Sequence, residues 1–309
     1  MTEPTTLLQA VRYFSSPAVC RELLAAQRWP DGPVCPRCGG ADPWFKQARG
    51  IWRCKACKRD FSVKVGTIFE DSPIPLTAWF PAIWMMSSSK KSVSSHGLAR
   101  ALGVTQKTAW FMVHRIRLLM KQGGFEPLSG EVEVDETFVG GKERNKHHSK
   151  RQHRGTGGIG KAAVMGLLAR HGEVRTKVVP NVRRATLQRV VRQQVAPGST
   201  VYSDSLASYG GLSWDYIHAT IDHAERYAEN RIHTNGLENF WSLFKRTIYG
   251  THHSVSPVHL DRYLDDATFR FNTRKMSDGA RFSATVAQAD GRRLTYKKLI
   301  GDSDDVTAQ

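Results

Sequence analysis

Four cysteines in two closely spaced pairs constrain the fold of this chain more than any other feature of its sequence. Each pair has the pattern CxxC, and residues 39–53 separate the two pairs. The four positions are Cys35, Cys38, Cys54 and Cys57. Two such turns direct four thiolates toward one point, the tetrahedral soft-ligand set that a structural zinc ion prefers. We therefore predict a zinc ribbon over residues 31–65, with two disulfides or a redox pair as the alternatives.

The charge of the 309-residue chain indicates a polyanionic partner. It has 45 Lys and Arg against 28 Asp and Glu, a net charge of +17 and a pI near 9.9. Nucleic acid fits best, although ribosomal and membrane-surface proteins share such values. No apolar run approaches the roughly 20 residues that span a bilayer, and residues 1–14 lack a secretory pattern. We expect a cytoplasmic, nucleoid-associated protein with no membrane partner.

A helix-turn-helix pattern lies within residues 66–125, after short N-terminal helices in residues 1–30 and the ribbon. The apolar positions of residues 94–118 fit a helix, a turn at Gly103 and a second helix that Thr105 caps. Outward side chains of the second helix are candidates for the major groove and flanking phosphates. These candidates are Gln106, Lys107, Thr108, Trp110, Arg115 and Arg117. A plain helical hairpin would give a similar pattern.

From residue 128 the composition changes to alternating strands and helices, which is typical of an α/β domain. Strands are expected in residues 131–141, 161–170, 172–180, 199–205 and 215–222, and a helix in residues 185–194. The basic segment 142–154 is either a solvated loop or a contact for phosphates. The predicted class is thus α/β, with a mixed sheet in residues 128–275 and a C-terminal tail over residues 276–309.

Residues 233–250 predict an amphipathic helix. Apolar side chains recur with the i, i+3, i+4, i+7 spacing of one helical face, which should be buried. They are Leu237, Phe240, Trp241, Phe244 and Ile248. Asn235, Glu238 and Lys245 share another stripe, one or two turns apart. An ordinary helix with a solvated charged side would also explain this stretch.

Acidic residues in this region suggest chemistry. Glu131, Glu133 and Asp135 share one face of the first strand, which is costly unless that face meets cations. Asp204 ends another apolar strand, and Glu238 lies on the helix. Acids in these three places suit a two-metal phosphoryl-transfer site, because carboxylates that repel one another are neutralised by Mg²⁺.

Through these residues the chain resembles bacterial insertion-sequence transposases of the DDE superfamily, in the ISXO-like group that joins a zinc ribbon to an RNase H-like core. The matching segments are residues 28–40, 57–80, 134–143, 202–209 and 233–274. The resemblance implies an RNase H-like catalytic domain, Mg²⁺ or Mn²⁺ as its cofactor, and a homo-oligomer on double-stranded DNA. It also implies nicking at element ends, followed by attack of the 3′ hydroxyl on target DNA without a covalent enzyme intermediate.

By the same resemblance, Asp135, Asp204 and Glu238 are the catalytic, metal-binding triad, and Lys245 holds a phosphate. Asn235 is the alternative at the third position; we favour Glu238 because a carboxylate binds a hard cation better than an amide does. Two other functions stay open. One is a DNA-binding regulator built from the ribbon and the helix-turn-helix, and the other is an RNase H-like nuclease that does not join strands.

Overall fold

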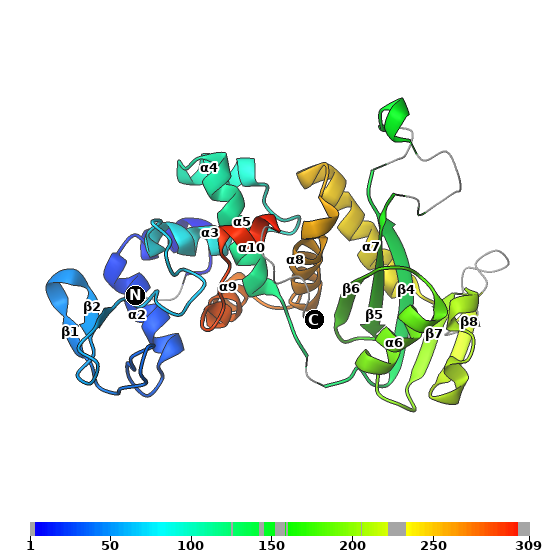
Figure 1. Cartoon of the computed structure of the whole chain (residues 1–309), viewed down its shortest axis with the longest axis horizontal. Coiled ribbons are helices and arrows are strands. Elements are labelled where there is room, and N and C mark those ends of the chain that lie inside the picture. The colour runs from blue at the N-terminus through cyan, green and yellow to red at the C-terminus, as the bar shows by residue number, and fades with distance from the viewer. Residues whose placement is uncertain are drawn as a thin grey trace. The chain divides into compact units, whose positions relative to one another are not determined.

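Two units make up the chain (Figure 1). The computed structural model describes residues 4–124, 126–141, 145–151, 158, 160–204, 206–221 and 233–301. The first unit contains the chain up to Met120 and from Lys275 onward, and the second contains Lys121–Arg274. This division corrects the expected C-terminal tail, because residues 276–301 fold as part of the first unit.

Helices dominate the first unit. They are α1 (Leu7–Tyr13), α2 (Pro17–Arg28), α3 (Leu76–Ser88), α4 (Ser95–Leu102), α5 (Gln106–Met120), α9 (Asp278–Val286) and α10 (Tyr296–Ile300). The central helix is α3, whose aromatic side chains are almost fully buried. Phe282 of α9 contacts the rings of Phe14, Phe80 and Trp84. The C-terminal helices therefore complete a core that begins at the N-terminus.

A three-stranded antiparallel sheet forms the ribbon, in the order β1-β2-β3. Its strands are β1 (Trp44–Lys46), β2 (Ile51–Arg53) and β3 (Asp60–Phe61). The register aligns Phe45 with Trp52 and Trp52 with Phe61, so these three rings share one face. Trp29, at the end of α2, packs edge-on against Trp52 and Phe61. One face of the small sheet is thereby buried against α2.

The helix-turn-helix elements are α4 and α5, joined as predicted by a turn at Gly103. Gly103 has φ +67°, a left-handed conformation that ends α4. The Thr105 hydroxyl accepts the Thr108 N–H at 3.2 Å and caps α5. Leu98 and Ala109 are fully buried between the helices and the rest of the unit.

A five-stranded mixed sheet forms the second unit, in the order β6-β5-β4-β7-β8. The strands are β4 (Glu131–Val139), β5 (Ala162–Ala169), β6 (Val174–Val179), β7 (Thr200–Asp204) and β8 (Ile217–Ile221). Neighbours among β4, β5 and β6 are antiparallel, whereas β7 is parallel to both β4 and β8. This order and direction are those of an RNase H-like core, so the predicted fold class is confirmed.

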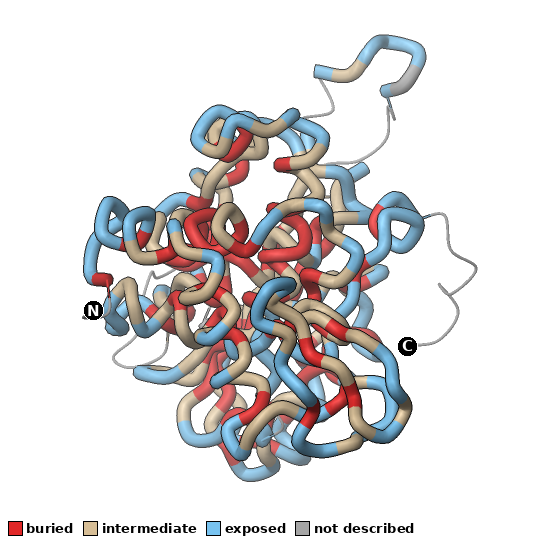
Figure 2. Tube along the Cα trace, turned by 90° about the vertical axis from the view of Figure 1, so that its left-hand side faces the viewer, coloured by how far each residue is buried: buried red, intermediate tan, exposed pale blue. Residues whose placement is uncertain are grey.

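Helices cover both faces of this sheet (Figure 1). They are α6 (Arg184–Gln194), α7 (Asn235–Thr247) and α8 (Leu260–Asn272). On one face α6 packs its Leu187 and Val191 against Val132 and Val134 of β4. On the other face α7 and α8 pack against β5 and β6. Figure 2 shows the buried residues along the chain in red.

Short helical turns connect the main elements. They are η1 (Gln47–Arg49), η3 (His148–Lys150), η4 (Ala207–Tyr209), η5 (Leu212–Trp214), the π-helical η6 (Ile248–His252), η7 (Pro257–His259) and η8 (Ala287–Ala289). Much of the basic segment 142–154 lies outside the described residues, so its predicted contact with phosphates stays a prediction. Within the described ranges, no helix has the length and apolar character needed to cross a membrane.

Candidate active site

Asp135 and Asp204 occupy equivalent positions on two neighbouring parallel strands. The β4–β7 ladder ends where Glu133 aligns with Tyr202, and each aspartate lies two residues beyond that pair. Since side chains two residues apart point to the same face of a strand, both aspartates project from the face that carries Glu133. The end of the ladder therefore brings two carboxylates from separate segments to one place.

Ionisation of the Asp135 carboxyl group is energetically unfavourable in the folded chain. Burial, followed by the negative charges of Glu136 and Asp204, raises the pKa of Asp135 to about 7. Trp241 of α7 donates its indole N–H to Asp135 Oδ2 at 3.0 Å, which fixes the orientation of the carboxylate. Because the charge of Asp204 contributes to this rise, the two carboxylates repel each other when both are ionised.

The other two acids on this face of β4, Glu131 and Glu133, share one cation, Arg170. Its guanidinium lies 3.1 Å from Glu133 Oε1 and 3.7 Å from Glu131 Oε2. Glu133 is 1% exposed and also accepts the Leu237 N–H at 3.0 Å. Among the described residues, no cation forms an ion pair with Asp135. One guanidinium against three carboxylates leaves this face of β4 with a net negative charge, to which Asp135 contributes.

Helix α7 runs along β4 from this point. Leu237 is held at Glu133, Trp241 at Asp135, and Lys245 lines a cavity of about 90 Å³ at the end of β4, beside Gly140. Close approach of the helix depends on Gly166 of β5, where a Cβ would lie 2.5 Å from the Trp241 ring. Helix α7 thus follows β4 from Glu133, past Asp135, to the end of the strand.

The third predicted acid is not joined to the pair in the same way. Glu238 and Asn235 are both exposed, and the Thr234 hydroxyl donates to Glu238 Oε1 at 3.5 Å. In the part of the chain that is described, the four cysteines are the one group of at least three His, Cys, Asp or Glu residues whose ligand atoms all lie within 4.8 Å. The structure therefore couples Asp135 to Asp204 and leaves Glu238 outside a closed cluster.

Sequence reasoning missed Glu136 and Tyr209. The Tyr209 hydroxyl donates to Glu136 Oε2 at 2.6 Å, and the ring is fully buried. Burial and the charge of Asp204 raise the pKa of Glu136, with the Tyr209 hydrogen bond acting against them. Alternation along β4 places Glu136 on the face opposite Asp135. The tyrosine five residues after Asp204 was the available signal.

The four cysteines of the ribbon meet as predicted. Their Sγ atoms all lie within 4.8 Å of one another, with Cys35 and Cys57 at 3.8 Å and Cys38 and Cys54 at 3.5 Å. These distances exceed the S–S bond of about 2.05 Å, so the thiols are not paired as disulfides. The Cys57 N–H donates to Cys54 Sγ at 3.4 Å and lowers the pKa of Cys54 to about 6. Four soft thiolate ligands around one point fit a structural zinc ion.

The DNA-contact candidates divide into two groups. Gln106 and Lys107 are exposed and Thr108 is partly exposed in the first turn of α5, where a recognition helix contacts base edges. Arg115 and Arg117, predicted to contact DNA, are instead only 5% and 1% exposed. The physical reason for Arg115 is that its guanidinium donates to the carbonyls of Leu294 and Glu70, so the expected tail covers it.

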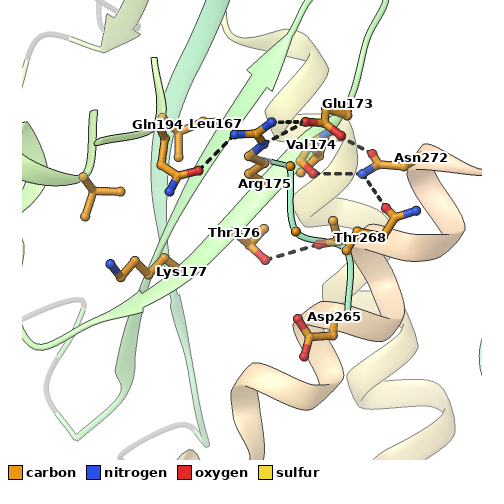
Figure 3. Close-up of a pocket in the computed structure, with 14 residues that line it drawn as sticks. Leu167, Glu173, Val174, Arg175, Thr176, Lys177, Gln194, Asp265, Thr268 and Asn272 are labelled. Carbon is orange, nitrogen blue, oxygen red and sulfur yellow. Dashed lines mark hydrogen bonds and ion pairs between the residues drawn. The ribbon is translucent and has the colours of Figure 1, made fainter. Parts of the chain in front are cut away.

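A separate polar cavity of about 190 Å³ lies beside β6 and α8 (Figure 3). Several of its polar groups are paired with one another. Arg175 donates to Glu173 at 2.7 Å and to Gln194 at 3.2 Å, and the hydroxyls of Thr176 and Thr268 are 3.2 Å apart. The aspartate pair is not part of its lining. Gln122, Gly123 and Gly124, where the chain enters the second unit, form one side of this cavity.

Comparisons with known proteins match two parts of the chain, one containing the ribbon and the other the mixed sheet. A zinc ribbon and an RNase H-like core define a nucleic-acid-processing protein, and residues 15–60 match the transposase zinc-ribbon domain while residues 127–272 match the ISXO2-like transposase domain. The chain belongs to this transposase family.

Relatives support this assignment. An uncharacterized transposase-like protein of Haemophilus influenzae is 37% identical over 105 residues, which is 34% of this chain and 85% of that protein. An uncharacterized protein in transposable element ISH50 of Halobacterium salinarum is 28% identical over 274 residues, covering 83% and 91% of the two chains. A solved pre-cleavage Mos1 transpososome is 12% identical, with 66% of this chain and 76% of that one covered and a TM-score of 0.28.

Proposed function

We propose that this transposase nicks DNA at the ends of its element and joins the freed 3′ hydroxyls to target DNA by metal-dependent phosphoryl transfer. The observation that carries the proposal is the aspartate pair at the end of the β4–β7 ladder. Asp135 is half-buried, repelled by Glu136 and Asp204, and paired with no cation among the described residues. A divalent cation would relieve that repulsion, and carboxylate oxygens are the ligands that Mg²⁺ and Mn²⁺ prefer.

In this proposal Asp135 and Asp204 hold the metal ions. When bound, two Mg²⁺ ions supply activation of the attacking hydroxyl and stabilisation of the leaving oxygen. Hydrogen bonds within the chain orient both carboxylates. Trp241 fixes Oδ2 of Asp135, and the Leu206 N–H donates to Asp204 Oδ1 at 3.1 Å, so neither carboxylate has to reorient.

Glu238 is our choice for the third carboxylate. Along an α-helix Glu238 precedes Trp241, the residue level with Asp135, by about 4.5 Å, whereas Asn235 precedes it by about 9 Å. Around the axis the two lie about 60° and 120° from Trp241. By both measures Glu238 is nearer than Asn235 to the residue that contacts Asp135.

Lys245 is placed to hold the DNA backbone. It follows Glu238 by two turns on the same stripe and lines the cavity at the end of β4 together with Gly140 and Gly141. Its ammonium would bind a phosphate next to the one that reacts. The double-stranded ends would be read by the first turn of α5, through Gln106, Lys107 and Thr108, with the protein acting as a homo-oligomer.

The alternative functions and mechanisms explain fewer features of the molecule. A DNA-binding regulator would have no use for an uncompensated pair of aspartates at a strand end. A serine nucleophile would be sought at Ser203, whose hydroxyl is 2.9 Å from His218 Nε2, but Ser203 is fully buried and a DNA phosphate could not reach it. A nuclease that does not join strands is separated from a transposase by the assay below.

The test uses the DNA that flanks the gene, carried on a plasmid, with purified protein and Mg²⁺. Nicks with 3′ hydroxyls at the element ends and joined products are expected. Asp135→Asn and Asp204→Asn should each lose both products by at least about 100-fold while keeping DNA affinity, because the phosphate contacts remain.

Asp215→Asn is the matched control in the same unit, since Asp215 only forms a surface ion pair with Arg192. It should cleave and join normally. Cleavage that persists in Asp135→Asn and Asp204→Asn would show that the acids are misassigned, and nicking without any joined product would favour the nuclease.

A further inference from the structure

The outer face of the ribbon sheet combines aromatic and basic side chains. Trp44 aligns with Arg53, and Arg53 aligns with Asp60, so these three lie on the face opposite Trp52. Lys46, two residues after Trp44 on β1, shares that outer face. The inner face packs against α2 through aromatic rings, and the outer face has no such cover: Trp44 is 56% exposed.

Cations surround this exposed indole. The ammonium groups of Lys55 and Lys58 lie 6.0 and 5.8 Å from the centre of the Trp44 ring. They come from the second cysteine turn, so the metal site itself holds them beside the strand. An exposed ring with two ammonium groups next to it resembles the combination of stacking surface and phosphate ligands used in nucleic-acid binding.

The charge of this face exceeds what its own acids neutralise. Residues 42–60 contain six Lys or Arg against two Asp. Asp60 is shared among Lys46 at 2.9 Å, Arg49 at 3.5 Å and Arg53 at 3.8 Å, and Arg49 is 69% exposed. Three cations on one carboxylate leave a net positive surface, which is complementary to a polyanion and not to an apolar or acid-poor protein surface.

We propose that the outer face of the ribbon, defined by Trp44, Lys46, Arg49, Arg53, Lys55 and Lys58, is a second DNA-binding surface. Its cations bind backbone phosphates and Trp44 packs against a deoxyribose or an accessible base. Phosphate contacts carry no base information, so this surface adds sequence-independent affinity and orients the chain, separately from α5. The inference rests on the proposed DNA partner, but it does not depend on cleavage.

The experiment measures binding of full-length, zinc-loaded protein to a random-sequence DNA duplex by fluorescence anisotropy over a series of salt concentrations. No Mg²⁺ is added, so catalysis does not enter the readout. Trp44→Ala should weaken binding measurably, because the ring loses its packing against the sugar-phosphate backbone. Arg49→Gln/Lys58→Gln should reduce the slope of log affinity against log salt by about 1.8, since each phosphate contact contributes about 0.9.

Two control variants match these changes. Trp214→Ala removes a tryptophan that is 90% exposed in the other unit and has no described cation over its ring. Lys297→Gln/Lys298→Gln removes the same charge from exposed positions of α10 in the same unit. Both should bind DNA like the wild type, and all four variants should retain one zinc ion per chain.

Three results would overturn the proposal. The first is wild-type affinity and salt slope in both ribbon variants. The second is an equal loss in the matched controls, which would reduce the effect to overall charge. The third is a Trp44→Ala variant that binds DNA normally but changes the sedimentation of the DNA-free protein, which would make this face a contact between copies of the chain. Loss of cleavage with intact binding would count against the proposed function alone.

Discussion

Replacing Asp135 by Asn should stabilise the metal-free protein at alkaline pH. Asn keeps an oxygen that can accept the Trp241 indole N–H but removes the charge that Glu136 and Asp204 repel. The folded pKa of about 7 exceeds the ordinary value of 3.8. Because the folded state holds the proton more tightly, stability falls as pH rises between these values, and the cost is complete above pH 7.

The magnitude follows from that shift. A difference of about three pKa units corresponds to about 4 kcal/mol at 1.36 kcal/mol per unit. Asp135 is only partly buried, so solvent screening should reduce this to about 2 kcal/mol. For a unit of this size, that corresponds to a rise in Tm of about 4–8 °C at pH 8. The rise should shrink to about half near pH 5.5 and disappear below pH 4.

The assay is thermal unfolding of the wild type and Asp135→Asn in magnesium-free buffer at pH 8 and pH 5.5. Chelators are left out, because they would remove the ribbon zinc. Added Mg²⁺ should stabilise the wild type and leave the variant unchanged, which reverses their order. An Asp135→Asn protein that is less stable by the same amount at both pH values, with no difference in its response to Mg²⁺, would refute the reasoning.

Three other substitutions test the zinc ribbon and the contacts around Glu133. Cys54→Ser should lose the zinc ion and unfold the ribbon, measured as zinc content and as protease cleavage within residues 31–65; a folded, zinc-bearing variant would contradict the assignment. Gly236→Ala should cost about 1–3 kcal/mol in chemical unfolding, since its Cβ would lie 2.7 Å from Glu133 Oε2. Arg170→Met should cost about 3–5 kcal/mol by removing the guanidinium that pairs with the buried Glu133, and adding Glu133→Gln should recover part of the loss; equal stability of the single and double variants would argue against the pair.

Much of the fold was predictable because its signals are local. Strand alternation and turn residues located all five strands of the mixed sheet, and the spacing of the cysteines located the ribbon. Thr105 and Gly103 marked the helix-turn-helix because a cap and a left-handed turn are properties of single residues. These features need no knowledge of distant contacts.

The misplaced residues depend on distant contacts. Arg115 looked like a surface cation, but its partner is the carbonyl of Leu294, 179 residues away. Residues 276–309 were predicted to be a tail. Apolar residues of α9, which lies within this segment, pack against α3, a contact that the local sequence does not reveal. Glu136 was missed because its hydrogen-bond partner, Tyr209, is distant in the sequence. Sequence periodicity gives the face of a strand and not the residues that contact it.

The central claim is that the end of the β4–β7 ladder holds the catalytic metal. Crystals grown with Mn²⁺, with diffraction data collected on both sides of the manganese edge to separate it from zinc, would locate that metal directly. We predict an anomalous peak between the carboxylates of Asp135 and Asp204, with Glu238 as the third ligand, and no such peak in Asp204→Ala. Manganese bound elsewhere, or a peak that persists in Asp204→Ala, would contradict the account.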